Sequence, residues 1–311
     1  FASIRDAFGR ALVKLGEKNE KVVVLDADVS TSTRTAFFHD KFPERFFNFG
    51  IAEGNMMDVA AGMALVGKIP FASTFSSLAS LRALEQIRTS IAYPNLNVKI
   101  AGGYGGLSDF KDGPTHHSIC DLAIIRSIPN MTLIVPADAI ETEKAVYAVA
   151  QYVGPVYLRL SRAEVPVIFD ENYKMEIGKG NLLKDGTDVT LIATGIMVAR
   201  VLEAAKVLEK EEKISTRVIE IHTLKPLDVD IIIRAADETG AIVTAEEHSI
   251  IGGLAGAVAE VIAENKPVSI ERVGIKDTFT ESGKYNELLE KYGMGVKNII
   301  DAAKKVMKRK K

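Results

Sequence analysis

Several features that would place a chain in a special class are scarce in these 311 residues. A single cysteine, Cys120, excludes an intrachain disulfide framework and favours a reducing compartment, so we expect a cytoplasmic protein. No apolar run approaches the roughly 20 residues that cross a bilayer, and we expect no membrane association. The net charge of −2 and the pI of about 6.3 give no electrostatic reason to expect nucleic acid as a partner.

The composition that remains, 47% hydrophobic and 26% charged, is that of an ordinary globular protein long enough for two compact domains. Short apolar runs, such as 22–25 and 189–193, alternate with segments of helical period, such as 3–16 and 76–92, which predicts parallel sheets with helices on both faces. We therefore predict an α/β fold with two doubly wound domains. They are a mostly parallel first domain at residues 1–165 and a smaller α/β domain at 188–311. The period is lost at 166–187, which we expect to be a linker.

Glu53 is the first candidate for chemistry. It lies where a glycine-punctuated segment turns into an apolar helix that continues to Leu65. A carboxylate in the first turn of such a helix faces the positive end of the helix dipole and little water. There it can hold a short, charge-assisted hydrogen bond to a heterocycle nitrogen. A glutamate that only complements the dipole is the alternative reading of this segment.

Loops that follow the expected strands supply further candidates. The strand at 22–25 ends in an acidic, hydroxyl-rich loop with Asp28 and Ser32, and ligand sites of open α/β sheets lie at such strand ends. Turn or capping roles are the alternative for both residues. The glycine cluster at 102–108 fits neither a dinucleotide fingerprint nor a P-loop. The long polar excursion at 109–118 is of a kind that is often functional.

The second domain offers little chemistry. His222 and His248 are isolated in the sequence, and we predict a structural role for each. The glycines at 252–256 open an expected helix and could admit an anion, although close helix packing is the favoured interpretation.

Three stretches of the sequence are each a modest signal, but together they are characteristic of one protein family. They are residues 49–56 (FGIAEGNM), 70–75 (PFASTF) and 112–116 (DGPTH), the last followed by DLA, RSIPNM and PAD within 121–138. Supporting marks are ADV at 27–29, LSR at 160–162 and TLKPLD at 223–228. In this order they resemble the C-terminal portion of transketolase, and the likeness covers essentially the whole chain.

The resemblance implies thiamine diphosphate chemistry, with a pyrimidine-binding first domain and a transketolase C-terminal domain. In that family a glutamate, matched by Glu53, bonds to the aminopyrimidine ring and promotes loss of the thiazolium proton. The carbanion then moves a two-carbon ketol unit from a ketose phosphate to an aldose phosphate, as in the pentose phosphate pathway. The nucleophile belongs to the cofactor, and the protein orients it and tunes its protons.

The resemblance also implies roles for other residues. Phe75 would stack on the pyrimidine ring, for which a core aromatic is the alternative, and Asp28 would approach the cofactor across a subunit boundary. His116 would act as a catalytic residue near the donor's carbonyl and hydroxyls, and Asp112 would bind a sugar hydroxyl. The positions that bind the sugar's phosphate are matched by three residues, Arg162, Ser32 and Arg5.

Two departures from the family pattern concern the substrate channel. Tyr104 stands where many relatives place a further substrate histidine, and Leu78 stands at one of the usual aromatic positions. Both put the fine shape of the channel in doubt but leave the cofactor chemistry intact.

A larger departure is the missing diphosphate motif. Family members hold the diphosphate through a divalent metal bound by a Gly-Asp-Gly segment and a later Asn, and this sequence has no Gly-Asp-Gly. Either the chain is a fragment or the diphosphate-binding domain is a separate polypeptide. We hypothesise a split transketolase in which a separate N-terminal subunit binds the diphosphate and its Mg or Ca. This chain would bind no metal, would self-associate as the core of the dimer, and would act as two copies of each subunit.

Three rival interpretations remain open at this stage. A 2-oxo acid dehydrogenase beta subunit shares the glutamate context, but the DGPTH and LSR motifs are not expected there. A 1-deoxyxylulose-5-phosphate synthase has a comparable Thr-His but is normally one long chain. A non-catalytic paralogue would be favoured by loss of Glu53 or His116, and both are present.

Overall fold

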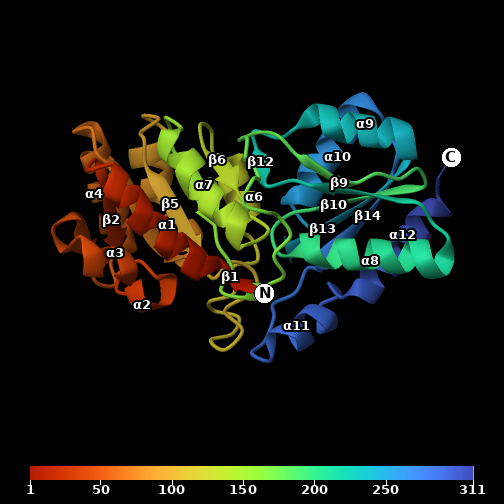
Figure 1. Cartoon of the computed structure of the whole chain (residues 1–311), viewed down its shortest axis with the longest axis horizontal. Helices are drawn as coiled ribbons and strands as arrows, with labels where there is room; N and C mark the ends of the chain where they lie inside the picture. Colours follow the sequence, from red (N-terminus) through yellow and green to blue (C-terminus); the bar gives the residue numbers. More distant parts are fainter. Residues whose placement is uncertain (311) are drawn as a thin grey trace.

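The computed structural model describes residues 1–310 and consists of two α/β halves that lie side by side (Figure 1). The first half is built on a seven-stranded sheet and the second on a five-stranded sheet. This confirms the predicted fold class of mostly parallel sheets with helices on both faces. A two-stranded ribbon, β1 (Ala2–Ser3) with β8 (Glu164–Val165), ties the N-terminus to the end of the first half.

The seven-stranded sheet is parallel throughout except at one edge, where β12 joins antiparallel. Both β2 and β7 are buried along their whole length, which is why their sequences are continuous apolar runs instead of alternating ones. In spatial order the strands are β12 (Thr223–Lys225), β6 (Thr132–Ile134), β7 (Val156–Arg159), β5 (Lys99–Gly103), β4 (Ile69–Phe75), β2 (Val22–Asp26) and β3 (Phe46–Asn48).

Helices cover both faces of this sheet. On one face α1 (Ile4–Lys18) packs on α7 (Ala139–Gln151), and their apolar stripes enter the same hydrophobic cluster. The other face carries α4 (Glu53–Leu65), η2 (Leu78–Arg82), α5 (Leu84–Gln86), η3 (Ile87–Ala92) and α6 (Asp121–Ser127). Short helices α2 (Ser30–Thr33), α3 (Ala36–Lys41) and η1 (Pro43–Arg45) connect β2 to β3.

The second half repeats the plan on a smaller scale. Its strands, in spatial order, are β14 (Ser269–Ile275), β13 (Ala241–Ser249), β10 (Val189–Ala193), β11 (Thr216–Glu220) and the antiparallel edge strand β9 (Asn181–Lys184). One face is covered by α8 (Met197–Glu212) and α12 (Val296–Met307), the other by α9 (Val229–Thr239) and α10 (Leu254–Asn265). A short helix, α11 (Tyr285–Lys291), precedes α12.

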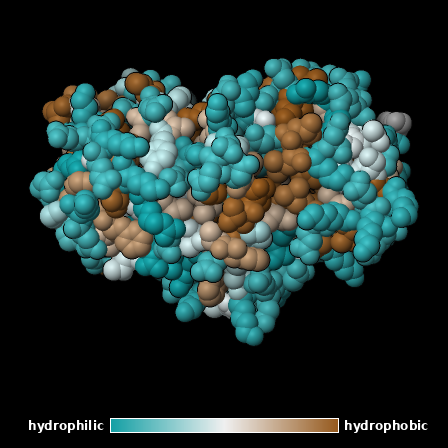
Figure 2. All heavy atoms as spheres, in the orientation of Figure 1, coloured by the Kyte–Doolittle hydropathy of each residue, from teal (hydrophilic) through white to brown (hydrophobic). Residues whose placement is uncertain are grey.

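Two hydrophobic clusters hold the halves together. One contains side chains of α1, α7, α8 and α12, and the other contains side chains of α4, α6, α9 and α10, so each cluster continues from one half into the other. Figure 2 shows hydrophobic residues gathered along the seam between the halves, with polar residues over both lobes. Within residues 1–310, no helix combines the length and the apolar character that a membrane crossing needs.

The structure differs from the sequence expectations in three places. The helix expected at 76–92 is broken into η2, α5 and η3, where π-type hydrogen bonds such as Ala83 N–H to the Leu78 carbonyl replace the α-helical pattern. The segment expected to be a linker contains β9, which pairs with β11. Strand β12, from the C-terminal part of the chain, completes the first sheet by pairing with β6.

Candidate active site

The candidate site lies at the carboxyl edge of the first sheet, beyond the ends of β2, β4 and β5. These strands end at Asp26, Phe75 and Gly103, and the loops that leave them carry most of the residues singled out in the sequence. An edge where parallel strands end beside one another is the usual ligand site of an open α/β sheet.

Glu53 is the first residue of α4 and is 1% exposed. The preceding residue, Ala52, supplies no side-chain cap, so the carboxylate is the acidic group at the positive end of this helix. Both carboxylate oxygens accept hydrogen bonds from Nη1 of Arg82, at 3.0 and 3.1 Å. The Arg82 side chain is 53% exposed, so a buried acid is paired with a partner that reaches out to solvent.

Tyr104 is the centre of a group of aromatic and cationic side chains that the sequence distributes widely. Its hydroxyl accepts a hydrogen bond from Arg5 Nη1 at 2.7 Å, and its ring lies 4.5 Å from the ring of Phe75. The Arg162 guanidinium carbon lies 5.0 Å from the centre of the same ring. We call Arg5, Phe75, Tyr104 and Arg162 the tyrosine–arginine cluster.

His116 is a half-buried neighbour of this cluster. Its ring lies edge-on to Phe75 with a centroid separation of 6.1 Å. The Thr115 hydroxyl lies 3.0 Å from His116 Nδ1, which leaves Nε2 as the nitrogen with no protein partner among the described residues. The imidazole therefore has one anchored and one available nitrogen, as a hydrogen-bond donor or proton carrier requires.

Asp109 is a buried acid in the polar excursion that the sequence did not single out. Its Oδ1 pairs with Arg162 Nη1 at 3.2 Å, while Oδ2 is buried without a partner among the described residues. Burial, and next the nearby Asp112 carboxyl, raise the pKa of Asp109 to about 7. Asp112 itself is exposed. The two predicted substrate residues, Arg162 and Asp112, thus lie next to the same buried acid.

Asp28 and Ser32 lie in the loop after β2 but differ in their contacts. Ser32 is joined to the cluster through its backbone, because its carbonyl accepts a hydrogen bond from Arg5 Nη1 at 3.1 Å. Asp28 has a left-handed backbone (φ 65°) and exchanges hydrogen bonds with Asn48. Within residues 1–310, no hydrogen bond or ion pair joins Glu53 or Asp28 to the tyrosine–arginine cluster.

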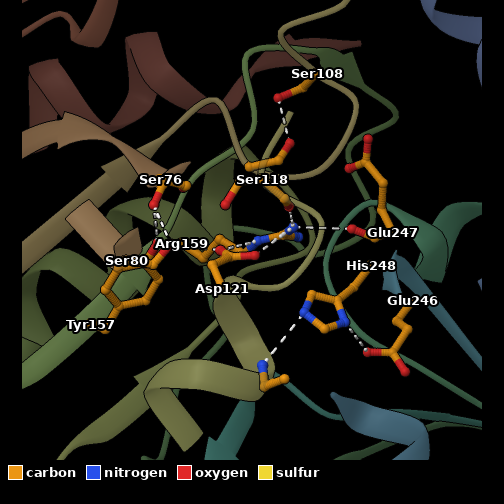
Figure 3. A network of polar contacts seen from close by, with 12 residues as sticks. Ser76, Ser80, Ser108, Ser118, Asp121, Tyr157, Arg159, Glu246, Glu247 and His248 are labelled. Atoms are coloured by element: carbon orange, nitrogen blue, oxygen red, sulfur yellow. Dashed lines mark hydrogen bonds and ion pairs between the residues drawn. The ribbon is translucent and has the colours of Figure 1, made fainter. Parts of the chain in front are cut away.

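A buried network fixes the loop that carries Tyr104 and His116. Figure 3 shows Arg159 at its centre, where the guanidinium donates to both Asp121 oxygens and to the carbonyls of Ser118 and Glu247. The Glu247 carboxylate in turn accepts the Leu107 N–H at 2.8 Å. Loop 105–118 is therefore held from the first sheet and from the second half together.

The remaining second-domain expectations concern His248 and the glycines at 252–256. The Glu246 carboxylate accepts the N–H groups of Leu254 and Ala255, at 2.7 and 2.8 Å, so the protein's own acid occupies the start of α10. A Cβ on Gly253 would lie 2.0 Å from Glu246 Oε2, so the glycine allows this close approach. His248 Nδ1 lies 3.6 Å from Oε2 of the same Glu246, and its structural role stays a prediction.

Known protein families, sequences and solved structures match this chain over most of its length. A family model described as the transketolase pyrimidine binding domain matches residues 2–167, and one described as the transketolase C-terminal domain matches residues 178–299. The chain is 48% identical to a protein of Methanocaldococcus jannaschii named, provisionally, as a transketolase C-terminal section; the match covers 100% of this chain and 97% of that one. It is 42% identical to the 6-deoxy-6-sulfo-D-fructose transketolase subunit of a Clostridium species, over 99% and 95% of the two chains. A solved structure named as a split gene transketolase, inactive beta4 tetramer, matches with a TM-score of 0.91 and 51% identity over 99% of both chains.

Proposed function

This chain belongs to the transketolase family, and we propose that it is the C-terminal subunit of a two-chain transketolase. The enzyme would transfer a two-carbon ketol unit from a ketose phosphate to an aldose phosphate. In this proposal residues 1–165 bind the pyrimidine end of thiamine diphosphate, 166–187 form the linker and 188–311 form the C-terminal domain. The observation that carries the proposal is Glu53, a buried carboxylate at a helix start whose only side-chain partner among the described residues is half exposed.

The residues around Glu53 fit the pyrimidine end of thiamine diphosphate, on which the family depends. A carboxylate sheltered from water bonds a ring nitrogen more strongly than an exposed one does. Arg82 can leave toward solvent when the ring arrives, because its side chain already reaches the surface. Phe75 would offer its ring for stacking, and Asp28 would approach the cofactor from a neighbouring subunit.

When bound, thiamine diphosphate supplies the carbon nucleophile to which the two-carbon unit becomes attached. The task of this chain is then to hold protons and groups in place around it. Glu53 would keep a proton on the ring nitrogen that it contacts. His116 would donate a hydrogen bond from its available Nε2 to an oxygen of the donor sugar, or carry a proton to and from it.

The cationic part of the site supports a phosphorylated sugar as substrate. Two arginines, Arg5 and Arg162, flank the Tyr104 ring at 5.7 and 5.0 Å, a pairing suited to a phosphate at the far end of a sugar chain. In the same proposal Ser32 completes the phosphate contact and Asp112 accepts a hydrogen bond from a sugar hydroxyl. Tyr104 orders Arg5 through its hydroxyl and takes up space that a histidine fills in many relatives.

We further infer that the active site needs a second kind of chain. The solved relative is named as a split gene transketolase in an inactive beta4 tetramer, and another relative is named as a transketolase subunit. A separate N-terminal subunit would bind the diphosphate through Mg or Ca, while copies of this chain self-associate as the core. Residues such as Asp28 would then serve a site in a neighbouring subunit.

The test is reconstitution. The chain is mixed with a candidate partner that carries Gly-Asp-Gly and a downstream Asn, with thiamine diphosphate and Mg²⁺. Transfer from xylulose 5-phosphate to ribose 5-phosphate is then compared with decarboxylation of pyruvate. We expect ketol transfer only when both chains are present, and none when Glu53→Gln replaces the wild-type chain.

Three results would contradict the proposal in different ways. Full transfer activity by this chain alone would remove the need for a partner. Pyruvate decarboxylation without ketol transfer would instead favour a 2-oxo acid dehydrogenase beta subunit. A mixture that binds the cofactor but turns over neither substrate would favour a non-catalytic paralogue.

A further inference from the structure

A second group of ionisable side chains lies at the junction of the two halves, away from the candidate active site. Glu141 comes from α7 of the first half, Glu220 ends β11 of the second half, and His222 follows two residues later. All three are buried, with exposures of 0%, 0% and 1%. One ligating atom from each lies within 4.8 Å of the others. We call Glu141, Glu220 and His222 the junction triad.

The hydrogen bonds around the junction triad satisfy three of its four carboxylate oxygens. Glu141 accepts from the Ala137 N–H at 2.6 Å and from the Tyr173 hydroxyl at 2.6 Å. Glu220 Oε2 accepts from Asn181 Nδ2 at 2.7 Å. Glu220 Oε1 is buried and has no partner among the described residues. A buried carboxylate oxygen left in this state costs free energy unless something occupies it.

The charged groups around the junction triad also leave its negative charge uncompensated. The charged neighbours that act on Glu220 are Glu141 and Asp138, which are both acidic. Asp138 is itself committed to backbone N–H groups of Glu141, Ile168 and Phe169. Two carboxylates buried side by side need a proton or a cation between them, because a like-charged pair is strongly unfavourable in a low-dielectric interior.

We propose that the junction triad is a structural site for a divalent transition-metal ion, Zn²⁺ or Mn²⁺, that clamps the two halves of the chain together. Carboxylate oxygens and a neutral imidazole nitrogen are ligands that these ions share. His222 is suited to the role because its Nδ1 bonds the Thr223 hydroxyl at 2.7 Å, which orients the ring.

The geometry needs a contraction of the triad. Ligands bonded at about 2.1 Å to one tetrahedral ion lie about 3.4 Å apart, whereas the ligating atoms of the triad lie within 4.8 Å of one another. A contraction of at most about 1.4 Å therefore brings each pair of atoms to coordination distance. The groups that orient the ligands are already in place, because Tyr173 links the two sides by donating to Glu141 and accepting from Asn181.

The experiment uses the tag-free full chain, so it does not depend on the partner subunit or on catalytic activity. The chain is purified without chelator and its metal content is measured by mass spectrometry. It is then stripped with EDTA and dialysed against Zn²⁺, Mn²⁺ or Mg²⁺. We expect about one Zn²⁺ or Mn²⁺ per chain, weaker binding of Mg²⁺, and a melting temperature that rises with the concentration of the bound ion.

Matched variants separate the junction triad from surface binding. Glu220→Gln keeps the shape of the side chain and a bond to Asn181, and we expect it to weaken binding by at least 10–100-fold while the circular dichroism spectrum is unchanged. His222→Gln should do the same if the first variant fails to fold. Glu85→Gln and His39→Gln, which alter exposed residues, should leave the ion content unchanged.

Two results would overturn the proposal. One is a stripped chain that binds neither Zn²⁺ nor Mn²⁺ and whose melting temperature does not change when either ion is added. The other is a Glu220→Gln variant that is as stable as the wild type, or more so, with the same ion content. Either result would mean that a proton, and not a metal ion, neutralises the two carboxylates.

Discussion

Glu53 and Asp121 are both buried carboxylates that pair with an arginine, yet their surroundings differ. Asp121 is 0% exposed and its partner Arg159 is only 5% exposed, so both ends of that pair are enclosed. Glu53 is equally buried, but its partner Arg82 is 53% exposed. The acids are alike, and the exposure of the arginine sets them apart.

In the proposed function this difference makes one pair structural and the other available for a ligand. Removing Arg159 from Asp121 would leave a charge inside the protein with no replacement, since solvent does not reach it. Arg82 already reaches solvent, so its guanidinium is hydrated when it leaves Glu53, and the arriving ring would take its place at the buried carboxylate. We therefore expect the Glu53 pair to exchange its guanidinium for a ring nitrogen, whereas the Arg159 pair holds the loop between the halves.

The largest expected effect comes from replacing the acid of the Glu53–Arg82 pair. Glu53→Gln keeps the size of the side chain but cannot hold a proton on a ring nitrogen as a carboxylate does, so turnover by the reconstituted enzyme should fall about 10²–10⁴-fold. The melting temperature should change little. Glu85→Gln, on the same surface region but exposed, is the control and should keep the wild-type rate. A Glu53→Gln enzyme with most of its activity would refute the assignment.

Breaking the enclosed pair should instead cost stability. Arg159→Met leaves Asp121 buried without its partner and should lower the free energy of unfolding by about 3–5 kcal/mol, measured by urea denaturation. The matched control is Arg88→Met, which removes an exposed partner of Glu85 and should have a far smaller effect. Comparable losses of unfolding free energy in the two variants would show that the enclosure of Arg159 does not make its ion pair more stabilising.

The enclosed Arg159 network can also be tested through the pH dependence of stability. The residue to test is Glu247, whose backbone carbonyl accepts a hydrogen bond from Arg159. Burial raises the pKa of Glu247 from its ordinary 4.5 to about 7, so the folded chain holds this proton where the unfolded chain has lost it. Stability should therefore fall as the pH rises from 4.5 to 7, by at most about 3 kcal/mol. Glu247→Gln, which can still accept from Leu107 and Tyr285, should remove this contribution.

The measurement is the free energy of unfolding of both chains from pH 4.5 to 8. The wild type minus Glu247→Gln difference should decline up to pH 7 and be level above it. A difference that rises with pH would mean that Glu247 is ionised in the folded chain and stabilised by Arg159.

The smallest expected effect is at the solvent side of the site. His116→Ala should reduce kcat/KM for the ketose donor by about 10–100-fold, because one hydrogen-bond or proton-transfer contact is lost near the substrate. Thiamine diphosphate should bind with unchanged affinity, measured by titration of the cofactor in the same assay. A loss confined to cofactor affinity would show that His116 acts on the cofactor and not on the donor.

Much of the fold was open to prediction because its strands and helices carry their own pattern. The strand predicted at 189–193 is β10 with the same bounds, and the helix predicted at 3–16 is α1, displaced by one or two residues. The helix at 76–92 was predicted as continuous, but its hydrogen bonds shift to a π-type pattern as it packs beside α4 and α6. Strand β12 could not be predicted at all, because three residues become a strand only when β6 lies beside them.

The residues of the candidate site likewise fall into those that a local pattern marks and those that only the folded chain brings together. The start of α4 at Glu53 was readable, since an acid before an apolar helix has a local signature. Tyr104 was visible only as a departure, and its bond to Arg5 joins residues 99 positions apart. Asp109 gave no signal, because nothing local marks a loop aspartate as buried. The roles of Glu53, His116, Phe75, Asp28, Asp112, Arg162, Ser32 and Arg5 stay predictions.

By itself the sequence determined the α/β class, the family and the place where α4 begins, because periodicity and short motifs are written in neighbouring residues. Only the tertiary structure decided which acids are enclosed. It left Arg82 half exposed beside Glu53, closed Arg159 around Asp121, and brought Glu141 to Glu220 across the junction. The reason is physical: burial and charge pairing depend on what the rest of the chain packs against a residue, and no local pattern encodes that.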